Sequence, residues 1–243
     1  MSNDPFVHHP GLRGLVADPA LSRFRSITTA GIKDMLAGKG YPTDWLRTDA
    51  EREALRRAFL GELLHGHAGD LWVFAYGSLM WDPALLFTQV RRAHLPGYAR
   101  RFILRDVHGG RGTPEAPGLM AALDHGEEGC DGLVFQIAAA QIDAETNVLW
   151  QREMIGSGYY PVITPAQTAQ GPVQCLCFVA DHAAEAIVPQ ITRQEQIRCL
   201  VSGEGFLGTS LDYLRGIAGH FAVLGIEDAH VSGLLEDAEV AAG

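Results

Sequence analysis

The chain has 243 residues and a formal net charge of −10, and its 47% apolar and 20% charged content excludes disorder of the chain as a whole. The acidic balance and the absence of a Lys/Arg cluster argue against a nucleic-acid partner, because neutralising phosphates requires concentrated positive charge. No apolar run approaches the roughly 20 residues that span a bilayer, and residues 1–5 lack the features of a secretory signal. We therefore expect a cytoplasmic protein that contacts no membrane.

Residues 1–69 are expected to form an N-terminal extension made of an arm and one helix. Residues 1–30 carry Pro, Gly and isolated apolar residues without a sustained period, which predicts a loosely ordered arm. Thr48 and Glu51 have the spacing of a capping box, which marks the start of a helix. An apolar residue then recurs every four positions and predicts one buried stripe, at Leu55, Phe59 and Leu63.

Residues 70–240 are expected to form a second, larger region in which the apolar pattern becomes that of strands. Strand-length runs rich in β-branched and aromatic residues occur at 71–76, 100–107, 118–123, 130–137 and 173–180. Helical patterns occur at 143–155, 192–201, 210–223 and 229–239. The strands cluster instead of alternating with helices, so we expect an α+β fold with a small, mostly antiparallel β-barrel and surrounding helices.

The cysteines and histidines do not predict a metal site. Cys175 and Cys177 lie two apart on an expected strand, so their thiols point to the same face, and no nearby histidine completes a zinc-binding set. Buried apolar cysteines are the favoured interpretation. His65 and His67 lie in a Gly-rich stretch without an adjacent carboxylate, and we interpret that stretch as a solvated linker.

A glycine at the end of the strongest strand is the first candidate for function. Gly77 follows Tyr76 and allows a sharp turn or a close approach to a ligand. Such a turn aims successive backbone N–H groups into one concavity, which suits a carboxylate or a developing oxyanion. Taken alone, the tetrapeptide Tyr76–Leu79 is better explained by an ordinary strand-ending turn. Ser78 lacks the Gly-x-Ser-x-Gly context of a nucleophile.

A carboxylate on the expected helix 143–155 is the second candidate. Glu153 lies four residues after Leu149 and three after Trp150, so it shares their face. Burial of that face would raise the pKa of Glu153 toward the range useful for proton transfer near neutrality. The alternative is an exposed helical glutamate paired with a neighbour.

Two loops offer further candidates for substrate binding. Arg111 lies in a turn-rich loop between two expected strands and has the geometry to bind a carboxylate bidentately, although a solvated loop arginine fits the sequence as well. Tyr159 and Tyr160 follow the glycines that end the helix of Glu153. Either tyrosine can supply a ring wall and a hydroxyl over a pocket, or simply pack against the helix end.

Five stretches combine these candidates in one order along the chain: Leu71–Pro83 (LWVFAYGSLMWDP), Arg111–Thr113, Pro117–Leu119, Arg152–Met154 and Gly158–Tyr159. Together they resemble the ChaC family of γ-glutamylcyclotransferases. The resemblance implies a β-barrel enzyme that converts glutathione, its small-molecule substrate, into 5-oxoproline and Cys-Gly without a cofactor or metal. It also implies that Glu153 is the general base and that the γ-glutamyl group binds at Val73, Phe74, Ala75, Tyr76, Gly77, Ser78 and Leu79.

The residue types present agree with this chemistry. The α-amine of a γ-glutamyl amide is tethered to the carbonyl that it attacks, so the reaction needs a base but no serine or cysteine nucleophile. Two alternatives stay open: ring closure on other γ-glutamyl amines or amino acids, and a non-catalytic module that binds a γ-glutamyl ligand or a partner. The sequence does not set an oligomeric state.

Overall fold

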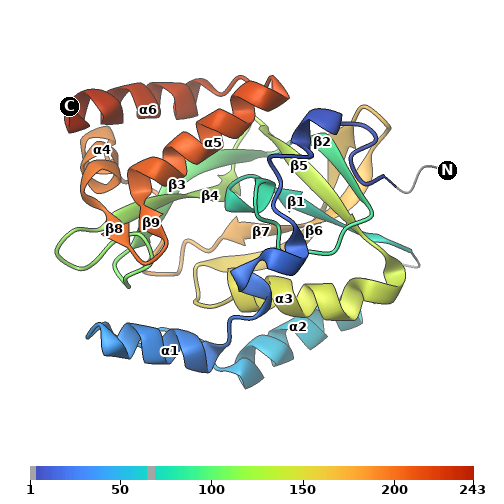
Figure 1. The fold of residues 1–243 in the computed structure, drawn as a ribbon, viewed down its shortest axis with the longest axis horizontal. Coiled ribbons are helices and arrows are strands. Elements are labelled where there is room, and N and C mark those ends of the chain that lie inside the picture. The colour runs from blue at the N-terminus through green and yellow to red at the C-terminus, as the bar shows by residue number, and fades with distance from the viewer. Residues whose placement is uncertain (1–3, 65–68) are drawn as a thin grey trace.

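Seven strands form one sheet in the computed structural model, which describes residues 4–64 and 69–243 (Figure 1). Strands β1, β5, β2, β6 and β7 follow one another in the sheet, and a parallel pairing of β1 with β7 closes them into a barrel. Strands β4 and β3 extend the sheet beyond β7. The strands span β1 (Leu71–Ala75), β2 (Gln89–Leu95), β3 (Tyr98–Asp106), β4 (Gly118–His125), β5 (Cys130–Ile137), β6 (Tyr159–Thr168) and β7 (Val173–Ala180).

Helices cover the sheet in two groups, which lie at opposite sides of the molecule in Figure 1. One group contains α1 (Thr29–Gly38), α2 (Asp49–Leu64) and α3 (Ile142–Glu153), with α2 packed on α3. The other contains α4 (Arg193–Ser202), α5 (Ser210–Leu224) and α6 (Ala229–Ala242), which pack against one another. A short hairpin, β8 (Glu204–Gly205) and β9 (Gly208–Thr209), joins α4 to α5.

The barrel and its helices confirm the predicted fold class, because most pairings are antiparallel and the helices lie outside. Every residue of β1 is buried, as its continuous apolar sequence predicts. Trp72 and Phe74 pack in a cluster built of strand residues, whereas Val73 and Ala75 face a second cluster that the helices share. Alternation of side chains along a strand therefore places β1 between two cores.

Five helices and strands escaped the sequence prediction: α1, β2, β6 and the two short strands β8 and β9. Strand β2 reads QVRRAHL, with only three apolar positions, and its arginines hide the period of the strand. Strand β6 contains two prolines and was expected to be loop at its start. Pairing with β7 over eight residues nevertheless makes it a strand, since tertiary context overrides a weak local propensity.

The capping box at the start of α2 is confirmed. The Thr48 backbone N–H donates to a Glu51 carboxylate oxygen at 2.7 Å, and the Glu51 N–H donates to the Thr48 hydroxyl at 3.2 Å. The predicted stripe needs a correction, because Leu55 is 41% exposed. The buried face of α2 is centred on Leu60 and includes two arginines, Arg52 and Arg56. Arg56 donates to the carbonyl oxygen of Asp143 at 2.9 Å.

The prediction of a loosely ordered arm over residues 1–30 is wrong for the residues that the structure describes. They form three 3₁₀ turns, η1 (Pro10–Leu12), η2 (Pro19–Leu21) and η3 (Arg23–Arg25), and the start of α1. Leu12 and Val16 are buried in the main core. Turns this short have no sustained helical period, so the sequence pattern did not reveal them. His65 and His67 lie outside the described residues.

Candidate active site

A cavity of about 750 Å³ opens where the end of β1, the end of α3 and the loop after β3 meet. Seven of the predicted site residues line it: Tyr76, Gly77, Ser78, Leu79, Arg111, Glu153 and Tyr159. Val73, Phe74 and Ala75 do not line it, because they lie within β1 with no exposed surface. The structure thus brings the glycine bend and the predicted base to one cavity, although 76 positions separate Gly77 from Glu153.

Glu153 is the last residue of α3 and shares the buried face of Trp150, as the helical spacing predicts. Its side chain keeps 16% of its surface, which faces the cavity. Burial raises the pKa of Glu153 above its ordinary value, and the neighbouring Arg152 guanidinium opposes that rise. The Nε atom of Arg152 lies 3.0 Å from Oε1 of Glu153. The carboxylate is therefore a base whose pKa lies closer to neutrality than that of an exposed glutamate.

Arg152 joins the helix end to the loop after β1. It donates to the Ser78 hydroxyl at 2.8 Å and to the carbonyl oxygen of Asp82. Its guanidinium also lies 4.2 Å from the centre of the Phe24 ring. These contacts hold the Glu153 end of α3 against the bend that carries Gly77. Sequence reasoning noted Arg152 only as part of a motif and assigned it no role.

The bend after β1 presents three unpaired backbone donors. Gly77 caps the short turn η4 (Ser78–Met80). Within residues 4–64 and 69–243, the N–H groups of Gly77, Ser78 and Leu79 donate to no protein acceptor. Arg100 donates from Nε to the carbonyl oxygen of Tyr76 at 2.7 Å. A trans peptide directs its N–H opposite to its carbonyl, so this contact orients the N–H of Gly77 away from Arg100.

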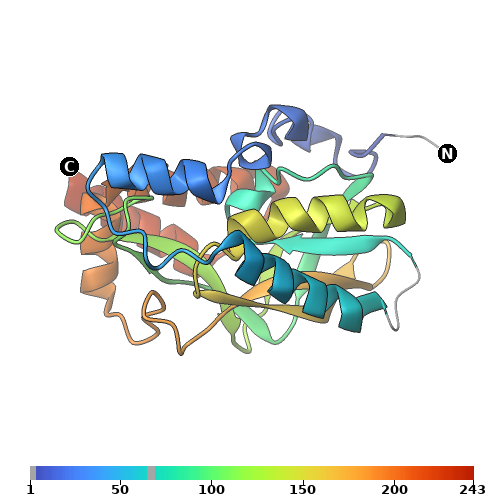
Figure 2. The ribbon, with the colours of Figure 1, turned by 90° about the horizontal axis from the view of Figure 1, so that it is seen from below.

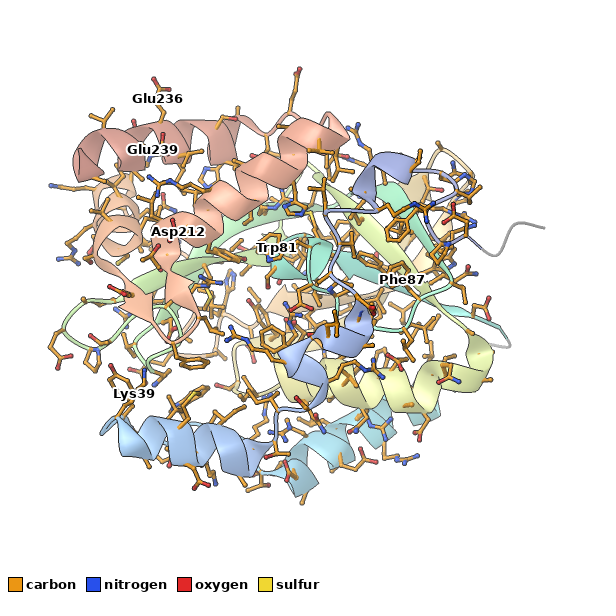
Figure 3. The ribbon with its side chains drawn as sticks, viewed as in Figure 1. Lys39, Trp81, Phe87, Asp212, Glu236 and Glu239 are labelled. Carbon is orange, nitrogen blue, oxygen red and sulfur yellow. The ribbon has the colours of Figure 1, made fainter. Side chains whose placement is uncertain are left out.

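Gly77 is required here by close packing. A Cβ atom on this residue would lie 2.6 Å from the hydroxyl oxygen of Tyr213. Tyr213 belongs to α5 and is held in place by Trp81, whose ring centre is 5.9 Å away. Trp81 lies beside α5 in Figure 3. The bend and α5 therefore approach each other at a distance that only glycine permits.

Three tyrosines share the cavity with the Glu153 carboxylate. Tyr76, Tyr159 and Tyr213 line the cavity, and the charge of Glu153 acts on all three hydroxyls. Burial raises the pKa of each, that of Tyr213 to about 12, so all three are neutral donors near pH 7. Tyr160 instead points outward, where its hydroxyl lies 3.1 Å from Nε2 of His125. Of the two candidate tyrosines after α3, only Tyr159 lines the cavity.

Arg111 reaches the cavity from the loop between β3 and β4. The Asp106 carboxylate accepts the N–H groups of His108 and Arg111 and so fixes the loop. The Arg111 guanidinium lies 4.8 Å from the centre of the Tyr213 ring and donates to the carbonyl oxygen of Thr209 at 2.9 Å. Burial lowers its pKa. It makes no ion pair with a carboxylate in the described part of the chain, so its charge is available to a ligand.

One wall of the cavity comes from the N-terminal region, which sequence reasoning did not connect with the site. Trp45 stacks on His108 with ring centres 4.4 Å apart. The residues that this region contributes are Ala17, Arg23, Phe24, Ile27, Ile32, Leu36 and Trp45. No periodic pattern marks them, so only the fold identifies them.

The described residues hold no group of three or more His, Cys, Asp or Glu side chains placed to bind a metal ion. None of the helices within them combines the length and apolar content that crossing a bilayer requires. Cys175 and Cys177 lie on β7 as predicted, buried, with their sulfurs 3.7 Å apart. Burial raises the pKa of Cys177, which keeps it a thiol.

The fold and site together define a barrel protein in which a desolvated carboxylate and unpaired backbone donors line one cavity. Comparison with known proteins gives the family. Residues 71–241 match the family model described as ChaC-like protein, and the chain therefore belongs to the ChaC-like family. The predicted resemblance is confirmed.

Curated relatives and a solved structure support this assignment. The chain is 33% identical over 168 residues to a protein of Escherichia coli K12 named glutathione-specific gamma-glutamylcyclotransferase, covering 69% of this chain and 72% of that protein. It is 29% identical over 181 residues to mouse glutathione-specific gamma-glutamylcyclotransferase 1, covering 70% and 79%. The crystal structure of the yeast cyclotransferase specific to glutathione superposes with a TM-score of 0.65 at 21% identity, covering 71% of this chain and 97% of that one. This likeness shows that the two share the barrel fold.

Proposed function

We propose that this protein is a γ-glutamylcyclotransferase that converts glutathione into 5-oxoproline and cysteinylglycine. The names of the E. coli and mouse relatives support the reaction and the substrate. The observation that carries the proposal is the Glu153 carboxylate, which burial makes more basic, in one cavity with the unpaired N–H groups of the Gly77 bend.

The first step is attack of the α-amine on the γ-carbonyl. The amine is mainly protonated near neutrality, and Glu153 takes a proton from it so that the nitrogen lone pair is free. A C–N bond forms and closes a five-membered ring, while the carbonyl π electrons move onto oxygen. Because the amine and the carbonyl belong to one molecule, no bimolecular encounter is needed and the cavity has only to orient them. This lowers the activation free energy by about 7 kcal/mol or more in well-aligned cases.

The second step is collapse of the tetrahedral intermediate. The oxyanion electrons re-form the carbonyl, the bond to the cysteinyl nitrogen breaks, and Glu153 returns its proton to that leaving nitrogen. The ring nitrogen loses its second proton, which the free amine of Cys-Gly takes up. The products are 5-oxoproline and Cys-Gly, with no water consumed. The N–H groups of Gly77 and Ser78 would hold the oxyanion or the α-carboxylate, and one such donor is worth about 3 kcal/mol. Neutral Tyr159 would donate a further hydrogen bond.

Arg152 would act on Glu153 by position. Its guanidinium keeps the carboxylate aimed into the cavity and limits the rise in its pKa. Ser78 accepts a hydrogen bond from Arg152 and is assigned no nucleophilic role. Arg111, which has no carboxylate partner in the described residues, would hold a carboxylate of the substrate.

The decisive experiment is release of 5-oxoproline from glutathione by the wild type and by Glu153→Gln. We expect the variant to lose activity by 10²–10⁴-fold while it still binds glutathione, because loss of a general base has effects of this size. Glu62→Gln on the exposed face of α2 is the matched control and should keep normal turnover. Near-normal turnover by Glu153→Gln would overturn the assignment of the base.

Two further outcomes separate the alternatives. Comparable turnover of γ-glutamyl-alanine and glutathione would assign a broader cyclotransferase. Binding of glutathione by the wild type without any 5-oxoproline release would assign a non-catalytic binding module. Cytoplasmic location also stays a prediction, which fractionation of cells that express the tagged chain would test.

A further inference from the structure

The active-site cavity is rich in arginine. Four arginines line it: Arg23, Arg105, Arg111 and Arg152. Arg152 is paired with Glu153, whereas Arg23, Arg105 and Arg111 make no ion pair with a carboxylate among residues 4–64 and 69–243. The charge of Arg105 also acts on Glu195 of α4. In a chain of net charge −10, three guanidinium groups without an ion pair at one cavity need an explanation.

Arg23 belongs to the N-terminal wall, outside the region that matches the family model. Apart from its contact with the ring of Phe24, 5.4 Å from its guanidinium carbon, its side chain has no hydrogen-bond or ionic partner within the described chain. Both Arg23 and Arg111 line the cavity, and the charge of Arg23 adds to burial in lowering the pKa of Arg111. Two cations at one cavity repel each other unless an anion binds between them.

The turn that carries Arg23 is held firmly in place. Arg25, two residues later on η3, makes a two-pronged ion pair with Glu145 of α3, with N–O distances of 2.6 and 3.0 Å. Arg25 also donates to the carbonyl oxygen of Ala84 at 2.7 Å. Figure 1 shows this blue segment passing in front of the barrel, Figure 2 shows it to one side of both the barrel and α3, and η3 packs on α3. Arg23 therefore has an anchored backbone and a free guanidinium, which is the arrangement of a binding residue.

Phe24 contacts both Arg23 and Arg152, and so places Arg23 near the reacting centre. The guanidinium carbons of Arg23 and Arg152 lie 5.4 and 4.2 Å from the centre of the same Phe24 ring. Arg152 in turn contacts Glu153. A γ-glutamyl group held at Glu153 leaves the two residues Cys-Gly, which extend about 7 Å. That length takes the glycyl carboxylate past Phe24 toward Arg23.

We propose that Arg23 of the N-terminal segment, together with Arg111 at the same cavity, binds the glycyl carboxylate of the substrate and makes the enzyme selective for a γ-glutamyl dipeptide with a free C-terminus. The inference rests on the proposed function. It assigns Arg23 a role in specificity and none in the reaction steps. One wall of the barrel site is then built by a segment that precedes the family-matched region.

The experiment compares glutathione with glutathione C-terminal amide, which keeps every atom of the reaction but lacks the distal charge. Arg23→Gln should raise KM for glutathione about 10-fold and leave kcat within about twofold. Arg23 is exposed, so we expect its charge-assisted hydrogen bonds to contribute a binding free energy at the lower end of the usual range. The same variant should leave KM for the amide unchanged. Arg23→Lys should recover part of the loss.

A matched control and a second measurement keep the test decisive. Arg57→Gln removes an equal charge from the exposed side of α2 and should not alter KM for either substrate. Equal effects of Arg23→Gln on glutathione and on its amide, or none on either, would overturn the inference. Calorimetric binding of Cys-Gly and of its amide to Glu153→Gln, with and without Arg23→Gln, tests the same contact without turnover. If the wild type releases no 5-oxoproline, the proposed function fails. The role of Arg23 is tested separately by the calorimetric binding of Cys-Gly and of its amide.

Discussion

The barrel region and the N-terminal segment meet at the same cavity but contribute different things to it. The barrel region supplies Glu153, the Gly77 bend and the three tyrosines, all placed at the ends of regular elements. The N-terminal segment supplies a wall, held to the rest by a few arginines such as Arg25, which contacts α3. The contrast shows how a site can keep its reacting groups on a rigid scaffold while a separate segment shapes the pocket.

This difference also appears in how each part is held together. Backbone hydrogen bonds run through the whole barrel, and its strands are buried on both faces at β1. The segment before α2 has turns and one helix of ten residues. Side-chain contacts such as the Arg25–Glu145 ion pair, and not backbone pairing in a sheet, hold it to the rest of the molecule. Changes in the barrel should therefore act on kcat, and changes in the segment on KM and on local stability.

After the loss of Glu153, the largest expected effect on activity comes from Gly77→Ala in the barrel region. The added Cβ would lie 2.6 Å from the Tyr213 hydroxyl oxygen, so the bend must shift, and a displacement of about 1 Å near reacting groups costs about 100-fold in kcat/KM. Steady-state assay of 5-oxoproline release measures this. Tyr213→Phe removes the hydroxyl that the added Cβ would meet. The double variant Gly77→Ala/Tyr213→Phe should therefore be more active than Gly77→Ala alone and recover part of the activity of Tyr213→Phe. Normal kinetics for Gly77→Ala would show that the bend does not set the geometry.

Arg25→Met tests the anchor of the N-terminal segment and has the next largest effect. It leaves the fully buried Glu145 without its cation, which costs about 3–5 kcal/mol in the free energy of unfolding. Urea denaturation measures this loss, and we expect KM to rise more than kcat falls. The double variant Arg25→Met/Glu145→Leu should regain most of the stability, since no unpaired charge remains. A loss below about 1 kcal/mol would show that the pair is not the anchor.

Glu153 predicts a link between pH, activity and stability. Its pKa is higher in the folded than in the unfolded chain, so between those two values the folded state binds more protons and stability falls as pH rises. Glu153→Gln removes this titration, so the difference in thermal midpoint between the variant and the wild type should shift in favour of the variant as the pH rises from 4 to 8. The acid limb of kcat/KM should lie above the pH of an ordinary glutamate. An acid limb at or below pH 4.5 would contradict the burial of this group.

The smallest effect is expected at Leu55 of α2. Because Leu55 is 41% exposed, Leu55→Ala should change the free energy of unfolding by no more than about 0.5 kcal/mol. Leu60→Ala on the buried face of the same helix should cost about 2–5 kcal/mol. Chemical denaturation of both variants compares the two faces, and an equal loss at the two positions would restore the stripe predicted from the sequence.

Local patterns were sufficient for much of the fold. The apolar run of β1, the capping box of α2 and the helical spacing of Glu153 from Trp150 each depend on residues within a few positions, and each was predicted correctly. Strand β6 was missed because its prolines obscure the strand period, and its pairing with β7 is a contact between distinct segments. The same limit explains Leu55, whose exposure depends on which face of α2 meets α3.

By itself, the sequence determined which groups are available for chemistry: a helical carboxylate beside apolar neighbours, a glycine after a buried strand, and a loop arginine. Only the tertiary structure decided that they meet in one cavity, that Tyr159 and not Tyr160 joins them, and that an N-terminal turn carries Arg23 and Phe24 to the same place. The physical reason is that spacing along a helix or strand sets the face on which a side chain lies. Which faces come together depends on packing between segments distant in sequence, and no local period records it.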